Sequence, residues 1–144
     1  MRAVVTRVSS ASVEIDGIVT GSIGEGFLVL LGVKNGDTAA DAAKLASRVC
    51  NLRVFGDHEG KMNLDLKAVG GGILVISQFT LYADCSSRRP GFSEAARPDT
   101  AIPLYELFIG ECTDAGFTVE TGRFGAMMSV KSINEGPVTI IIDS

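Results

Sequence analysis

Residues 27–33 read FLVLLGV, seven positions in a row without a polar or charged side chain. An apolar run of this length is typical of a strand that is buried on both faces, whereas a half-buried strand alternates polar and apolar residues. Residues 73–80 begin with a second such run, ILVI. We therefore expect residues 27–33 to form a central strand and residues 73–80 a second buried strand.

Other segments show shorter β-type patterns. Residues 11–15 alternate apolar and polar side chains, and Asp16-Gly17 after them is a typical hairpin turn. Gly136 and Pro137 directly precede a run of β-branched residues, although proline donates no backbone hydrogen bond and is poorly tolerated inside a sheet. The strands expected besides the two buried ones cover residues 2–8, 11–15, 18–20, 52–55, 61–66, 117–120, 127–133 and 138–142.

Two segments have the period of helices. Thr38 and Asp41 resemble a capping box, and the apolar stripe after them consists of Ala42, Leu45, Ala46, Val49 and Cys50. Asp99 or Thr100 is expected to cap the second helix, with Pro103 in its first turn and Gly116 at C′. The stripe expected to be buried there consists of Leu104, Leu107, Phe108, Cys112 and Ala115. Many strands with two inserted helices predict an α+β fold: a β-sheet or barrel-like single domain over residues 1–144, with both helices packed on the sheet.

Charge and cysteine content exclude several classes of function. The net charge of −4 and the isoelectric point of about 4.9 argue against a broad non-specific nucleic-acid binder, but leave room for a small basic patch. The three cysteines are odd in number and widely spaced, so neither a disulfide framework nor a zinc site is expected. Cys50 and Cys112 are expected in the core, and Cys85 in a polar loop. No signal peptide and no apolar run long enough to span a membrane is found, so we expect a cytoplasmic protein.

Three stretches are candidates for chemistry, and each has a plain alternative. Ser77, Gln78 and Thr80 are either a strand end with locally satisfied hydroxyls or a site with donors aimed at a substrate. Residues 134–142, NEGPVTIII, are either a turn and strand or part of a site. The arginine-rich loop at residues 84–99 is either a solvated surface loop or a contact for phosphate or carboxylate.

Ordinary acid–base machinery is not visible. His58 is the only histidine and stands in an expected turn, far in sequence from any nucleophile. Asp and Glu show no paired spacing and no metal-ligand cluster, so neither a metal nor a cofactor is expected.

Taken together, several segments resemble the D-aminoacyl-tRNA deacylases, also known as D-Tyr-tRNA deacylases. The resemblance runs in order over nearly the whole chain, and its two signature motifs are SQFTL and Asn-x-Gly-Pro-Val-Thr. Glu135 stands where the family usually has Asp, a conservative difference. The segments are the N-terminal 33 residues, RVFGDHEGKMNLDL, SQFTLYAD, RRPGFSEAARPD, TGRFGAMMSV and NEGPVT.

The resemblance implies a hydrolase that cleaves the ester between a D-amino acid and the 3′-terminal adenosine of tRNA, and that also accepts glycine. It implies a homodimer with active sites at the interface, where a cis Gly136–Pro137 dipeptide reaches into the partner's pocket. The catalytic segment of that pocket would be Ser77, Gln78, Phe79 and Thr80. Weaker inferences assign Arg7 to bracing the Gly-Pro loop and Phe124 or Met128 to the adenosine pocket; Asn134 and Thr139 are further supporting residues.

An amino-acid ester is already activated, so positioning and oxyanion stabilisation are the expected contributions of the protein. Backbone N–H groups around Phe79 and Thr80 are the candidates for the oxyanion hole, and the terminal 2′-hydroxyl of tRNA is expected to assist. Carbonyls of Gly136 and Pro137 would hold the substrate amine so that an L side chain strikes the main chain. The alternatives are a non-catalytic RNA-binding module and an esterase of small substrates with Thr80 (or Cys85) as nucleophile.

Overall fold

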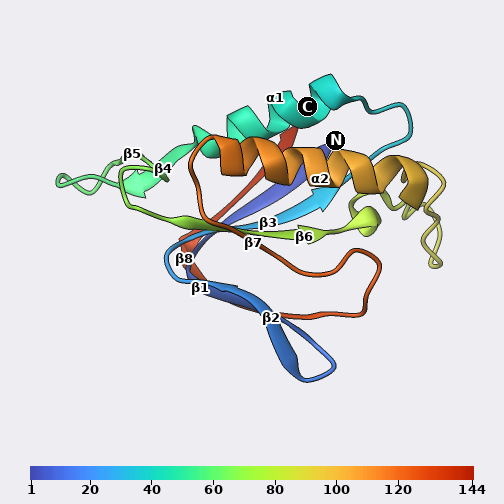
Figure 1. Cartoon of the computed structure of the whole chain (residues 1–144), viewed down its shortest axis with the longest axis horizontal. Helices are drawn as coiled ribbons and strands as arrows, with labels where there is room; N and C mark the ends of the chain where they lie inside the picture. Colours follow the sequence, from blue (N-terminus) through green and yellow to red (C-terminus); the bar gives the residue numbers. More distant parts are fainter.

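A computed structural model describes residues 1–144, and its elements follow the expected α+β order (Figure 1). The 3₁₀ helix η1 was not expected. The elements are β1 (Arg2–Ile15), β2 (Ile18–Ile23), β3 (Gly26–Gly32), α1 (Ala39–Cys50), β4 (Arg53–Gly56), β5 (Met62–Asp65), β6 (Gly72–Ser77), η1 (Phe79–Tyr82), α2 (Pro98–Asp114), β7 (Val119–Thr121) and β8 (Ser129–Asp143).

The main sheet has the strand order β2-β1-β3-β6-β7, and β8 pairs with β1. β3 lies between β1, which is antiparallel to it, and β6, which is parallel to it, so the central position predicted for residues 27–33 is confirmed. The sheet curves into a nearly closed, barrel-like shape. β4 and β5 form a separate hairpin, which extends away from the sheet at the left of Figure 1.

Both helices cover one face of the sheet, as predicted (Figure 1). Because successive residues of a strand point to opposite faces, Phe27 and Val29 of β3 pack under the helices while Leu28 faces the other side. The larger core cluster joins the helices to the sheet, with Leu45 and Phe108 fully buried in it. A smaller cluster fills the concave face. Neither helix has the length and apolar character needed to cross a membrane.

The first helix begins as predicted and the second does not. The carboxylate of Asp41 accepts hydrogen bonds from the N–H and the hydroxyl of Thr38, each at 2.8 Å. The second helix begins at Pro98 with Arg97 as its cap, so the expected caps Asp99 and Thr100 were wrong. Proline suits the first helical position because its missing N–H has no partner there.

The earlier start has consequences along α2. Pro103 lies inside the helix and not in its first turn. The buried stripe contains Ala101 and Tyr105 in addition to three expected residues, whereas Ala115 is exposed and Leu107 only half-buried. Gly116 has a φ of +95° and its N–H donates to the carbonyl of Thr113, which fits the predicted C′ position.

Two predicted strand boundaries were wrong in ways that bear on function. Residues 127–133 and 138–142 were expected as separate strands, but β8 runs unbroken from Ser129 to Asp143 through the Gly-Pro dipeptide. Residues 73–80 were expected as one strand, but β6 ends at Ser77 and Phe79 opens η1. The other boundaries differ by at most a few residues; residues 2–8 and 11–15, for example, are parts of the single strand β1.

Candidate active site

The SQFT segment, residues 77–80, lies where the chain leaves the sheet. The N–H of Gln78 still donates to the carbonyl of Leu31 on β3, at 2.8 Å, and η1 then turns the chain away. The side-chain amide of Gln78 donates to the hydroxyl of Thr80. Phe79 is 55% exposed, which is unusual for an aromatic side chain next to a buried strand. Its ring meets that of Phe92 edge to face, with 5.0 Å between centroids.

Two backbone donors of this segment are free. Phe79 and Thr80 are the first residues of η1, so no carbonyl of that helix lies in the right place to accept from their N–H groups. Neither of these two N–H groups donates in any turn or loop hydrogen bond of the chain. Adjacent unpaired N–H groups at a strand end are the kind of donor that stabilises an oxyanion.

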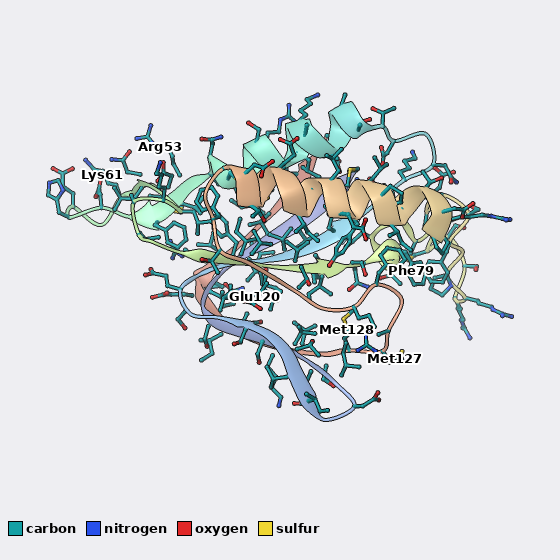
Figure 2. All side chains as sticks on the ribbon, in the orientation of Figure 1. Arg53, Lys61, Phe79, Glu120, Met127 and Met128 are labelled. Carbon is teal, nitrogen blue, oxygen red and sulfur yellow. The ribbon has the colours of Figure 1, made fainter.

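Ser77, Gln78 and Phe79 separate two hollows. One is a small cavity of about 50 Å³ under α2, whose other lining residues are Leu31, Val33, Ala96, Ala101, Tyr105 and Phe124. The other is a more open depression of about 280 Å³, bounded by the loop at residues 125–128. Figure 2 shows Phe79 at one end of the sheet, with Met127 and Met128 below it on that loop.

The predicted adenosine-pocket residues thus lie on the two sides of the SQFT segment. Phe124 borders the cavity and contacts Tyr105 at 5.9 Å between ring centroids. Met128 borders the open depression together with Met127, which is 92% exposed. Sequence reasoning missed Tyr105, although its position one residue after Leu104 on the apolar face of α2 was a usable signal.

No side chain around the hollows is poised as a general base. Neither hollow is lined by histidine, carboxylate or cysteine. The one titratable group is Tyr105. Burial raises the pKa of its hydroxyl to about 12, and this hydroxyl donates a hydrogen bond to the carbonyl of Val75 at 3.1 Å. His58 lies in the distant β4–β5 turn. The site therefore offers hydrogen-bond donors and shape, but no side chain to activate water.

The Gly-Pro dipeptide forms a bulge in β8. Thr6 of β1 pairs with Thr139 and Val8 pairs with Asn134, so Arg7 alone stands opposite residues 135–138. The Gly136–Pro137 peptide bond is cis, as the resemblance implied, and both residues are exposed. Proline is tolerated here because β8 is an edge strand and the bulge needs no N–H at that position.

Side chains hold the bulge from both ends. Arg7 donates from Nε to the carbonyl of Glu135 at 3.0 Å and from Nη1 to the carbonyl of Val54. The Asn134 amide accepts from the N–H of Val138 and donates to the hydroxyl of Thr139, both at 3.1 Å. Glu135 takes part in this network only through its backbone carbonyl. The network therefore does not depend on whether this position holds Glu, as here, or Asp, as is usual in the resembling family.

The two motifs do not meet within one chain. Ser77 pairs with Leu31, which pairs with Ala3 of β1, whereas the bulge stands opposite Arg7, four residues further along β1. At ordinary strand spacings this offset is about 13 Å along the strands and about 14 Å across them. Within one chain the two motifs therefore lie on different parts of the sheet.

Comparisons with known proteins agree with these features. Residues 4–143 match the family model described as D-Tyr-tRNA(Tyr) deacylase. Relatives described as D-aminoacyl-tRNA deacylase in Roseiflexus sp. (strain RS-1) and Thermus aquaticus are each 55% identical over this whole chain and over 94% and 95% of their own lengths. The solved structure of a c-Myc DNA unwinding element binding protein has a TM-score of 0.94 at 36% identity, covering 100% of this chain and 99% of its own.

A site with backbone donors and no side-chain base suits a hydrolase of an already activated ester. The chain belongs to the D-aminoacyl-tRNA deacylase family, hydrolases that act on the ester bond of D-aminoacyl-tRNA, and the resemblance noted in the sequence is thereby confirmed.

Proposed function

We propose that this chain proofreads the chirality of aminoacyl-tRNA at a site built from two subunits. One subunit contributes Ser77, Gln78, Phe79 and Thr80, and the other contributes the bulge with Gly136 and Pro137. The observation that carries the proposal is the separation of the two motifs, each with exposed residues and each held by its own hydrogen bonds. Exposed apolar side chains along β8 and β2 (Val130, Ile133, Ile141, Ile18 and Val19) offer a surface for a homodimer.

Chirality would be read by the main chain. Carbonyls of Gly136 and Pro137 hold the substrate amine, the ester carbonyl is held at the Phe79 and Thr80 N–H groups, and the α-carbon is fixed between them. A D side chain, or the hydrogen of glycine, then points to open space, whereas an L side chain strikes the backbone. This explains acceptance of many D-amino acids without a side-chain pocket.

Hydrolysis would rely on the substrate for part of its chemistry. Since no general base lines the hollows, the 2′-hydroxyl of the terminal adenosine assists the attack of water, and the free N–H groups stabilise the oxyanion. Met128 borders the open depression, which is the larger of the two hollows and the place for that adenosine, whereas Phe124 borders the small cavity on the other side of the SQFT segment.

Thr80 is assigned a positioning role because no base lies beside its hydroxyl, which instead accepts from the Gln78 amide. Thr80→Ala is expected to lower kcat by about 10-fold, as expected for loss of one orienting hydrogen bond. Single-turnover hydrolysis with a parallel binding titration measures this. Complete loss of hydrolysis with binding intact would instead make Thr80 the nucleophile.

The function is tested by incubating purified protein with D-tyrosyl-tRNA, L-tyrosyl-tRNA and glycyl-tRNA. Release of D-tyrosine and glycine with L-tyrosyl-tRNA left intact is the expected result. Equal resistance of the D and L esters would overturn the proposal.

A further inference from the structure

The loop between η1 and α2 is closed at its base. The N–H and carbonyl of Asp84 pair with the carbonyl and N–H of Gly91, at 2.8 and 2.9 Å, so residues 85–90 form a protruding tip. Within the tip, the hydroxyl of Ser87 donates to the carbonyl of Arg89 at 2.7 Å. Figure 1 shows this yellow segment at the right-hand end of the molecule, beside the start of α2.

The second half of the loop is fastened beside the candidate active site. Phe92 follows the closed tip directly and packs against Phe79. Asn35 then donates from its backbone to Glu94 and from its side chain to the carbonyl of Ser93, at 3.0 and 2.7 Å, and the N–H of Ala96 donates to the carbonyl of Val33. The tip is therefore held close to the SQFT segment.

The tip carries two adjacent guanidinium groups with no partner in the chain. Arg88 and Arg89 are exposed, and neither side chain makes a hydrogen bond or an ion pair with another residue. The loop's acidic groups are engaged elsewhere: Asp84 accepts from the N–H of Ser86 at 2.9 Å, and Glu94 pairs with Lys34 at 3.1 Å. In a chain of net charge −4, this is a local concentration of free positive charge.

We propose that Arg88 and Arg89 bind phosphates of the single-stranded 3′ end of the tRNA, next to the nucleoside that carries the ester. The inference rests on the proposed function, which puts that ester at Phe79 and Thr80. A guanidinium binds phosphate through two parallel hydrogen bonds. The exposed rings of Phe79 and Phe92 add a surface on which a base can stack, and cations beside exposed aromatics are how proteins commonly hold single-stranded RNA.

The test is the salt dependence of binding to an RNA oligonucleotide that ends in CCA and carries no amino acid, measured by fluorescence anisotropy. Each phosphate contact on a single strand contributes about 0.7 to the slope of log K against log salt concentration. Arg88→Ala with Arg89→Ala is therefore expected to make the slope shallower by about 1.4. When the salt concentration rises from 50 to 200 mM, both proteins lose affinity, and the factor lost by the double variant is then about 7-fold smaller than the factor lost by the parent chain.

A matched control separates local contact from net charge. Lys44 and Lys67 are exposed on α1 and in the turn after β5, and Lys44→Ala with Lys67→Ala removes the same charge away from Phe79. Its slope is expected to equal that of the parent. Arg88→Lys with Arg89→Lys keeps the charges and is expected to keep most of the slope. Equal slopes for the two alanine doubles would overturn the proposal.

Hydrolysis assays make this failure distinguishable from failure of the proposed function. With D-tyrosyl-tRNA, the arginine double is expected to raise KM about 10-fold, which corresponds to about 1.4 kcal/mol of binding, while kcat stays within about 2-fold because neither arginine touches the ester. If the parent chain hydrolyses the ester but the double variant keeps the parent's KM and slope, only the arginine assignment fails. If the parent binds RNA through the arginines but hydrolyses no D ester, the proposed function fails and the arginine assignment stands.

Discussion

Gly136→Ala is expected to lower kcat for D-tyrosyl-tRNA by at least about 100-fold, because small displacements of positioning groups have effects of this size. Gly136 has a φ of +126°, and a Cβ there would lie 2.7 Å from Nη2 of Arg7 and 2.9 Å from Cγ2 of Val138. Arg7 cannot give way without breaking its hydrogen bonds to the carbonyls of Glu135 and Val54. The bulge must therefore shift, and its carbonyls with it.

The chain is expected to remain folded, because the bulge lies on an exposed edge strand. Backbone strain of this kind costs about 1–3 kcal/mol, which is less than the stability of an ordinary domain. Gly116→Ala is the control: Gly116 has a φ of +95°, nothing lies within 4 Å of its Cβ position, and it ends α2 away from the SQFT segment. Comparable losses of activity in the two variants at equal stability would contradict a specific role for Gly136.

Gly26→Ala is expected to reduce the free energy of unfolding by at least about 3 kcal/mol, at the upper end of overpacking effects. Gly26 pairs with Gly72 where β3 and β6 begin, and a Cβ on Gly26 would lie 2.0 Å from the Gly72 carbonyl oxygen and 2.8 Å from its nitrogen. Both atoms are backbone, so only separation of the two central strands could relieve the contact.

Gly24→Ala is the matched control, two residues earlier, where nothing lies within 4 Å of the added methyl group. Urea unfolding of both variants measures the difference. Stabilities within about 1 kcal/mol of each other would show that β3 and β6 are less closely held than the structure indicates.

A continuous apolar run and a periodic apolar stripe predicted the central part of the fold well. The run at residues 27–33 indicated a central strand, and it lies between β1 and β6. The stripe from Ala42 to Cys50 is buried as expected. These predictions succeed because many residues of one element contribute to the same signal, a continuous run in the strand and a stripe at helical spacing in the helix.

The errors lie where a local signal has two physical meanings. Gly136 and Pro137 are turn residues, yet they form a bulge inside β8, because an edge strand beside Arg7 can accept a proline. Phe79 and Thr80 are typical strand residues after the apolar run ILVI, yet β6 ends at Ser77 and Phe79 opens η1. Asp99 resembles a cap, but Pro98 starts α2 before it. The separation of the two motifs follows from strand order, which no local pattern contains.

Phe79→Pro is expected to inactivate the SQFT segment, just as Gly136→Ala is expected to inactivate the Gly-Pro bulge. Proline fits the first position of η1, and Gln78 before it, with φ −144° and ψ 80°, is outside the α region that a following proline disfavours. The substitution removes one N–H of the proposed oxyanion hole, which is expected to lower kcat about 100- to 1,000-fold. Phe79→Ala, which removes the ring but keeps that N–H, is expected to lose much less of kcat.

In the proposed dimer, each site takes the SQFT segment from one subunit and the Gly-Pro bulge from the other. Gly136→Ala and Phe79→Pro chains are mixed in equal amounts, unfolded, refolded together and assayed on D-tyrosyl-tRNA. Half of the dimers are then mixed, and one of the two sites in each combines an intact segment with an intact bulge, so activity is expected to return to about a quarter of the parent's. Activity that stays at the level of the separate variants, with mixed dimers shown to be present, would mean that the two motifs do not form one site across the subunits.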